Sequence, residues 1–115
     1  AKKHNLVVVE DACMGIGGSH RGIPQGRFGQ IGAFSMHPLK SLNVMGDGGM
    51  LVTDDKDLFE WIVRYRNHGM KDRDHITMWG VNMRLQPLQA IVANIELPKV
   101  PQTIQDRQLP MTIFM

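Results

Sequence analysis

Three short apolar segments in the first half of the chain have the pattern of β-strands. Residues 6–9 form a continuous apolar run, which is typical of a strand buried on both faces. Residues 31–36 and 50–53 are two further short runs, and a glycine-rich turn at 46–49 precedes the last one. Residues 15–32 hold seven glycines, which is the composition of a loop and not of a helix. The pattern therefore predicts three strands, with a long loop between the first two.

Two segments in the second half have helical periodicity. The first is 54–68, which Asp54 or Thr53 can cap at its start and which Gly69 ends as a C-cap glycine. Its apolar positions fall on one helical face: Leu58, Trp61, Ile62 and Tyr65. The second segment is 85–97, with a proline in its first turn. The pattern therefore predicts two helices after the three strands.

The last part of the chain has no clean period. Pro98, Pro101 and Pro110 interrupt residues 98–115, so the sequence predicts no regular element there. No internal repeat or second domain is visible. We expect residues 98–115 to be a divergent or truncated tail.

The composition is that of an ordinary globular domain. The chain has 115 residues, of which 43% are hydrophobic and 21% charged, and this excludes a disordered chain. The net charge of +2 is spread along the sequence, which argues against a nucleic-acid partner. No apolar run approaches the length of a membrane span. The single cysteine, Cys13, favours a reducing compartment, so we expect a cytoplasmic protein.

Several common sites do not fit the residues. The glycines after the first strand begin like a dinucleotide fingerprint, but His20 stands where its third glycine should be. There is no phosphate-binding Gly-Lys-Ser/Thr motif, and the five histidines lack the spacing of metal ligands. The start of the chain, which lacks a methionine and enters an apolar run almost at once, indicates a piece of a longer polypeptide.

Asp11 and Lys40 are the candidate chemical residues. Asp11 follows the first predicted strand, and Lys40 follows the second, before the glycine turn. An acid and a lysine at the ends of two strands can face one pocket, which usually lies at the carboxyl edge of such a sheet. A lysine amine and an opposing carboxylate are what an enzyme dependent on pyridoxal 5'-phosphate (PLP) needs. The alternatives without a catalytic role are that Lys40 is a solvated loop residue and that Asp11 caps a helix.

Five motifs in this order resemble the PLP-dependent sugar aminotransferases of fold type I, the DegT/StrS type. They cover most of residues 1–97 and read VVEDA, GAFSMHPLK, GDGGMLVTDD, RYRNHG and WGVNMRLQPLQA. The resemblance implies an internal fragment of the large, PLP-binding domain. It also implies an α/β fold with a mixed sheet of about three strands, the first two parallel and the third antiparallel, and with two main helices.

The resemblance also implies the roles of individual residues. Lys40 would bind the PLP aldehyde covalently and act as the catalytic proton carrier. Asp11 would pair with the pyridine nitrogen, and Ser35 would bind the phosphate. Asn82 would reach the phosphate of a neighbouring subunit, because the family builds its sites at a homodimer interface. Met14 stands near the cofactor where the family usually has glutamine, and a thioether cannot donate the hydrogen bond that an amide donates.

The implied reaction is transamination of a nucleotide-linked keto sugar, with an amino acid, by family habit glutamate, as the amino donor. Two alternatives stay open. One is a non-catalytic remnant that serves as a dimerising or regulatory module. The other is a PLP-dependent sugar dehydratase, which the presence of Lys40 disfavours, since such enzymes typically have histidine there.

Overall fold

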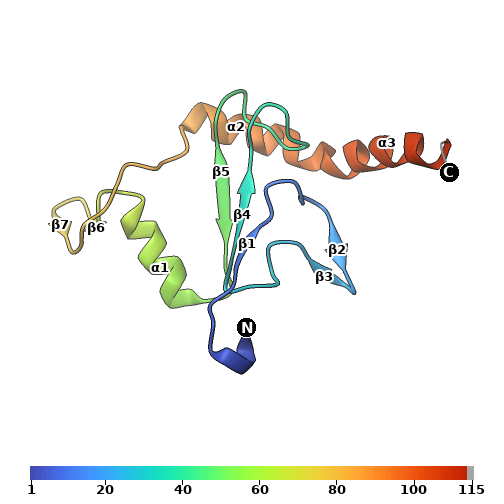
Figure 1. The fold of residues 1–115 in the computed structure, drawn as a ribbon. Helices are drawn as coiled ribbons and strands as arrows, with labels where there is room; N and C mark the ends of the chain where they lie inside the picture. The colour runs from blue at the N-terminus through green and yellow to red at the C-terminus, as the bar shows by residue number, and fades with distance from the viewer. Residues whose placement is uncertain (114–115) are drawn as a thin grey trace.

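A three-stranded mixed sheet forms the centre of the fold. The computed structural model describes residues 1–113, and side chains as far as residue 108 (Figure 1). The strands β1 (Val9–Asp11), β4 (Ile31–Ser35) and β5 (Gly49–Val52) lie in the order β1-β4-β5. β1 pairs with β4 in parallel, and β4 pairs with β5 in antiparallel. The predicted α/β fold and its mixed sheet are confirmed.

The first strand differs from the prediction. The apolar run at 6–9 was expected to be a doubly buried strand, but β1 begins at Val9 and runs into the acidic residues. Leu6, Val7 and Val9 are 60%, 72% and 67% exposed. β1 has a partner strand on one side only, and no described helix covers the run. The apolar composition was therefore a poor guide to burial at this edge.

The connection between the two parallel strands contains a small hairpin in place of a helix. Its strands are β2 (Ser19–His20) and β3 (Ile23–Pro24). Glu10 fastens the end of the connection to the sheet, because its two carboxylate oxygens accept hydrogen bonds from the backbone N–H groups of Gly26 (2.7 Å) and Phe28 (2.9 Å).

The helix α1 (Lys56–Tyr65) follows β5 and is shorter than predicted. Asp55, and not Asp54 or Thr53, is its N-cap, since Asp55 Oδ1 accepts a hydrogen bond of 3.0 Å from the N–H of Leu58. The chain leaves the helix after Tyr65 and turns at Gly69, whose φ is +72°. A hairpin of β6 (Met70–Asp72) and β7 (His75–Ile76) follows.

Two successive helices and a short 3-10 turn complete the chain. α2 (Pro87–Glu96) begins with a proline and lies within two residues of the prediction. The 3-10 turn η2 (Leu97–Lys99) joins it to α3 (Val100–Ile113), where no regular element was expected. Pro101 is tolerated because the first N–H groups of a helix have no intrahelical acceptor. Figure 1 shows α2 and α3 following one another past the ends of β4 and β5.

The core lies where the loop between β4 and β5 meets the start of α3. Its main cluster consists of four buried side chains, which come from β4's end, the loop and α3: Met36, Leu42, Val44 and Val100. Val44 is 1% exposed. A short 3-10 turn, η1 (Lys2–His4), begins the chain and contributes no buried residue.

Candidate functional site

The predicted site residues lie at the carboxyl edge shared by β1 and β4. Asp11 ends β1 and pairs with Ala33, and Ser35 ends β4 two residues later. Side chains alternate along a strand, so Ala33 and Ser35 point to one face. Asp11 points to that same face, because side chains opposite each other in a parallel pair lie on one side of the sheet. Glu10 is the other acid at this edge, and by the same alternation it points to the opposite face.

The loops after these two strands bring Lys40 and Met14 together. Lys40 Nζ lies 2.7 Å from Met14 Sδ and donates a hydrogen bond to it. The Lys40 residue is half-buried, whereas Met14 is 83% exposed. Lys40 sits in a tight turn, in which its N–H donates to the carbonyl of His37 at 2.9 Å. The Lys40 amine therefore lies against the loop that follows β1.

Asp11 is held in its charged form. Hydrogen bonds from the thiol and the backbone N–H of Cys13 lower the pKa of the Asp11 carboxyl, and the positive charge of Lys40 acts in the same direction. The Cys13 N–H donates to Asp11 Oδ1 at 3.0 Å. Asp11 is thus an anion at neutral pH, within electrostatic reach of the lysine amine.

Cys13 is a partner of Asp11 that the sequence did not reveal as part of the site. Its thiol faces two acceptors, the Ala33 carbonyl oxygen, 3.8 Å from Sγ, and the Asp11 carboxylate. The bond to Asp11, burial and the negative charge of Asp11 raise the pKa of the Cys13 thiol. Cys13 therefore stays protonated and serves as a donor to the acid.

Ser35 has its hydroxyl free to donate. Ser35 Oγ accepts a hydrogen bond of 3.3 Å from the N–H of His37. A hydroxyl that accepts one hydrogen bond can still donate its own hydrogen to an acceptor such as a phosphate oxygen. Ser35 lies on the same face as Asp11 and five residues before Lys40.

Asn82 lies apart from this cluster. Its backbone pairs with Asn67, just beyond the end of α1. The Arg84 guanidinium joins the two amides, because Nε donates to Asn82 Oδ1 and Nη1 to Asn67 Oδ1, each at 3.1 Å. The Asn82 amide oxygen thereby accepts a hydrogen bond from Arg84, and the Asn82 NH₂ group has no acceptor among the described residues. The structure brings Asp11, Met14, Ser35 and Lys40 to one edge and leaves Asn82 outside it.

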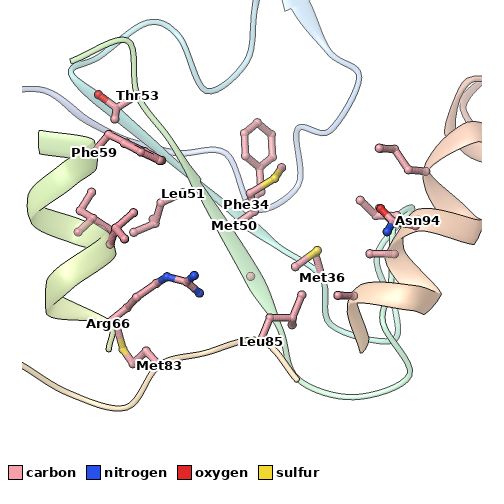
Figure 2. A pocket seen from close by; sticks show the side chains of 17 residues that line it. Phe34, Met36, Met50, Leu51, Thr53, Phe59, Arg66, Met83, Leu85 and Asn94 are labelled. Atoms are coloured by element: carbon pink, nitrogen blue, oxygen red, sulfur yellow. The ribbon is translucent and has the colours of Figure 1, made fainter. Parts of the chain in front are cut away.

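The large cavity of the fold opens on the opposite face of the sheet. It measures about 760 Å³ and lies between α1 and α2, against Phe34 and Met36 (Figure 2). Phe34 precedes Ser35, the last residue of β4, and Met36 follows it. Because side chains alternate along a strand, Phe34 and Met36 point to the face opposite that of Ser35. The lining is apolar apart from Thr53, Arg66 and Asn94. The cavity lining therefore contains none of the titratable groups of the candidate site, and its titratable residue is Arg66.

A metal-binding cluster and a membrane-spanning helix are both absent from residues 1–113. Within this range no three His, Cys, Asp or Glu side chains gather in a way that could hold a metal ion. In the same range, no helix combines the length and the apolar character that crossing a bilayer requires.

Comparison with known proteins identifies relatives of the chain. The sequence profile of the DegT/DnrJ/EryC1/StrS aminotransferase family matches residues 1–114. A curated relative, UDP-N-acetyl-3-dehydro-alpha-D-glucosamine 3-aminotransferase from Acidithiobacillus ferrooxidans, is 43% identical over 98 residues, which are 85% of this chain and 27% of the relative. A second, dTDP-3-amino-3,4,6-trideoxy-alpha-D-glucose transaminase from Streptomyces venezuelae, is 39% identical over 84% of this chain and 26% of its own length.

Solved structures share the fold. DesV from S. venezuelae, in complex with a ketimine intermediate, superposes with a TM-score of 0.84 at 38% identity and covers 89% of this chain and 28% of its own. GDP-4-keto-6-deoxy-D-mannose-3-dehydratase from E. coli, with bound hydrated PLP, gives a TM-score of 0.84 at 24% identity over 93% of this chain and 32% of its own. At that identity the second likeness shows the fold alone. This chain spans a little over a quarter of the length of the curated relatives, and it belongs to the DegT/DnrJ/EryC1/StrS aminotransferase family.

Proposed function

We propose that the protein containing this chain is a PLP-dependent aminotransferase, and that residues 1–97 are part of its PLP-binding domain. The observation that carries this proposal is the position of the Lys40 amine, which contacts Met14 in the loop after β1 and lies within electrostatic reach of Asp11. PLP needs an amine for its aldehyde and an anion for its ring nitrogen. The cluster offers both on one face of the sheet, so the residues fit the cofactor.

When bound, PLP supplies an electron sink for the carbanion that forms as a proton leaves the substrate. Lys40 would hold the cofactor through Nζ, and its amine, when free, would serve as the base and acid that moves a proton between the reacting carbon atoms. Asp11, which is ionised, would favour the protonated form of the ring nitrogen, because a nearby negative charge stabilises the charged ring.

Two polar side chains suit the phosphate. The Ser35 hydroxyl can donate to a phosphate oxygen from the Lys40 side of the sheet. The NH₂ group of Asn82, whose amide oxygen accepts from Arg84, is a second donor, and its position outside the cluster supports a role in the site of a neighbouring subunit. We therefore propose a homodimer whose sites are shared between subunits.

We propose that the substrate is a nucleotide-linked keto sugar, and that an amino acid, glutamate, donates the amino group. This proposal is supported by two relatives that are named as enzymes acting on UDP- and dTDP-linked amino or keto sugars. Because the chain spans only about 27% of the first relative, the reaction of the whole protein stays a proposal.

An amino-transfer assay on the full-length protein tests this function. Glutamate, PLP and a panel of UDP- and dTDP-linked keto sugars are supplied, and 2-oxoglutarate and amino sugar are measured. Equal formation of the two products, which Lys40→Ala abolishes and the exposed-surface variant Lys71→Ala leaves intact, supports the proposal. Loss of water from the sugar without amino transfer would point to the dehydratase alternative. No turnover of any sugar in the PLP-loaded protein would favour the non-catalytic alternative.

A further inference from the structure

One face of α3 packs under the loops that carry the candidate site. Val100, which begins α3, is 6% exposed and shares the buried cluster with Leu42 and Val44. These two residues follow Lys40 by two and four positions. Ile104, one turn further along α3, packs against the same cluster. The beginning of α3 is therefore built into the base of the Lys40 loop.

Ile104 also reaches the loop that carries Met14. Ile16, two residues after Met14, packs against the same buried cluster. A Cβ added at Gly17 would collide with Ile104 Cδ1, so the helix and this loop are in close contact. α3 thus contacts both loops whose side chains meet in the Lys40–Met14 hydrogen bond.

Arg107 extends this contact to the residue next to the lysine. Arg107 Nη1 donates a hydrogen bond of 2.8 Å to Ser41 Oγ. Positions 100, 104 and 107 are spaced i, i+4 and i+7, so they lie on one face of the helix. The two apolar side chains hold the base of the loop, and the guanidinium holds the position after Lys40.

Local hydrogen bonds also restrain the loop near Lys40, among them those from the Leu39 N–H to His37 Nδ1 and from Lys40 Nζ to Met14 Sδ. The base of the loop is closed by backbone hydrogen bonds, from Met36 to Gly48 at 2.8 Å and from Val44 to Met36 at 3.2 Å. At the tip, Leu39 is 82% exposed. The Ser41–Arg107 bond adds a side-chain hydrogen bond between the neighbourhood of Lys40 and α3. A displacement of about 1 Å at a reacting group can cost on the order of a hundredfold in rate.

We propose that α3 is the positioning element of Lys40, and that Arg107, acting through Ser41, fixes the loop so that the amine stays within electrostatic reach of Asp11. Arg107 is a positioning residue and contacts no reacting atom. The proposal deepens the proposed function, on which it rests, because the placement of Lys40 has chemical meaning only if its amine binds the cofactor. It also gives residues 98–113 a role in the site.

The test compares Arg107→Ala, Ser41→Ala and the double variant of the full-length protein, with Gln105→Ala on α3 as the matched control. The first readout is amide hydrogen exchange of residues 37–43 without cofactor. Loss of one hydrogen bond predicts exchange faster by about two- to twelvefold in each single variant. The double variant should exchange no faster than either single one, since both remove the same bond. Arg107→Lys, which keeps a charged donor, should restore part of the protection.

The second readout is the rate at which added PLP becomes covalently bound, followed by absorbance. This rate of covalent binding should be lower in Arg107→Ala, in which amide exchange is faster, and unchanged in Gln105→Ala. Unchanged exchange in Arg107→Ala, or effects that add fully in the double variant, would overturn the proposal. The two readouts distinguish failure of the proposed function from failure of the positioning role. Covalent binding of PLP at a residue other than Lys40 refutes the proposed function. Amide exchange of residues 37–43 that is as slow in Arg107→Ala as in the parent refutes the positioning role alone.

Discussion

Val44→Ala tests the buried cluster that supports the site. Val44 is 1% exposed and lies in the same cluster as Met36, Leu42 and Val100. The substitution removes the equivalent of two buried methylene-sized groups, each contributing about 0.8 kcal/mol. The cavity left behind raises the expected loss in the free energy of unfolding to about 2 kcal/mol. This loss corresponds to a factor of about 30 in the folding equilibrium.

Urea unfolding followed by far-UV circular dichroism measures this loss. With a slope of about 2 kcal/mol per molar urea, the midpoint should fall by about 1 M, with the slope unchanged. The matched control is Val7→Ala, which removes the same groups from a side chain that is 72% exposed. Its cost, scaled to the buried fraction, is about 0.5 kcal/mol. Equal midpoints for the two variants would refute the placement of the core at the junction of the β4–β5 loop and α3.

Three further predictions concern the site and the β6–β7 hairpin. Met14→Gln should tighten PLP binding, because an amide donates a hydrogen bond where the thioether only accepts one; weaker binding in an equilibrium titration would contradict this. Gly69→Ala should destabilise the fold by about 1–3 kcal/mol, since φ is +72° and a Cβ would strike the Met78 carbonyl; an unchanged melting temperature would refute the strain. The hydrogen bond with His75 lowers the pKa of the Asp72 carboxyl below its ordinary value of 3.8. A lowered folded-state pKa means that the pair stabilises the hairpin above about pH 4 and that this contribution is lost as pH falls through the lowered pKa. Chemical shifts of the hairpin should therefore titrate at low pH in the parent and not in Asp72→Asn.

The sequence predicted β4, β5 and α2 within about two residues because each follows from its own local pattern. β4 alternates between buried Gly32 and Phe34 and the half-buried residues beside them, and α2 begins with Pro87 at the position where proline fits. β1 was misplaced because an apolar run shows a tendency to be buried, and not whether a neighbouring element is present to bury it. The extent of such a strand depends on packing that its own residues do not encode.

α3 was missed for a different reason. Among the described side chains, its contacts with the fold include those of Val100, Ile104 and Arg107, and the prolines around them suggested an interrupted chain. Pro101 is compatible with the first turn of a helix, so a proline near a predicted boundary can begin an element as well as end one. The sequence alone could not distinguish these two cases.

The order of Asp11, Ser35 and Lys40 in the site was predictable, but its contacts were not. The Lys40–Met14 bond joins the loops that follow two different strands, and the two residues are 26 positions apart in the sequence. The Cys13 thiol at Asp11 likewise depends on the turn that follows β1. These contacts require the relative placement of two loops, and a single sequence has no local signal for that placement.

The central claim is that the Lys40 amine bonds covalently to PLP. The direct measurement is borohydride reduction of the PLP-loaded full-length protein, followed by proteolysis and mass spectrometry of the peptides. The account predicts the reduced cofactor on the peptide that contains Lys40, and no incorporation in Lys40→Arg. A cofactor adduct on another lysine, such as Lys56 or Lys71, with full labelling of Lys40→Arg, would contradict it.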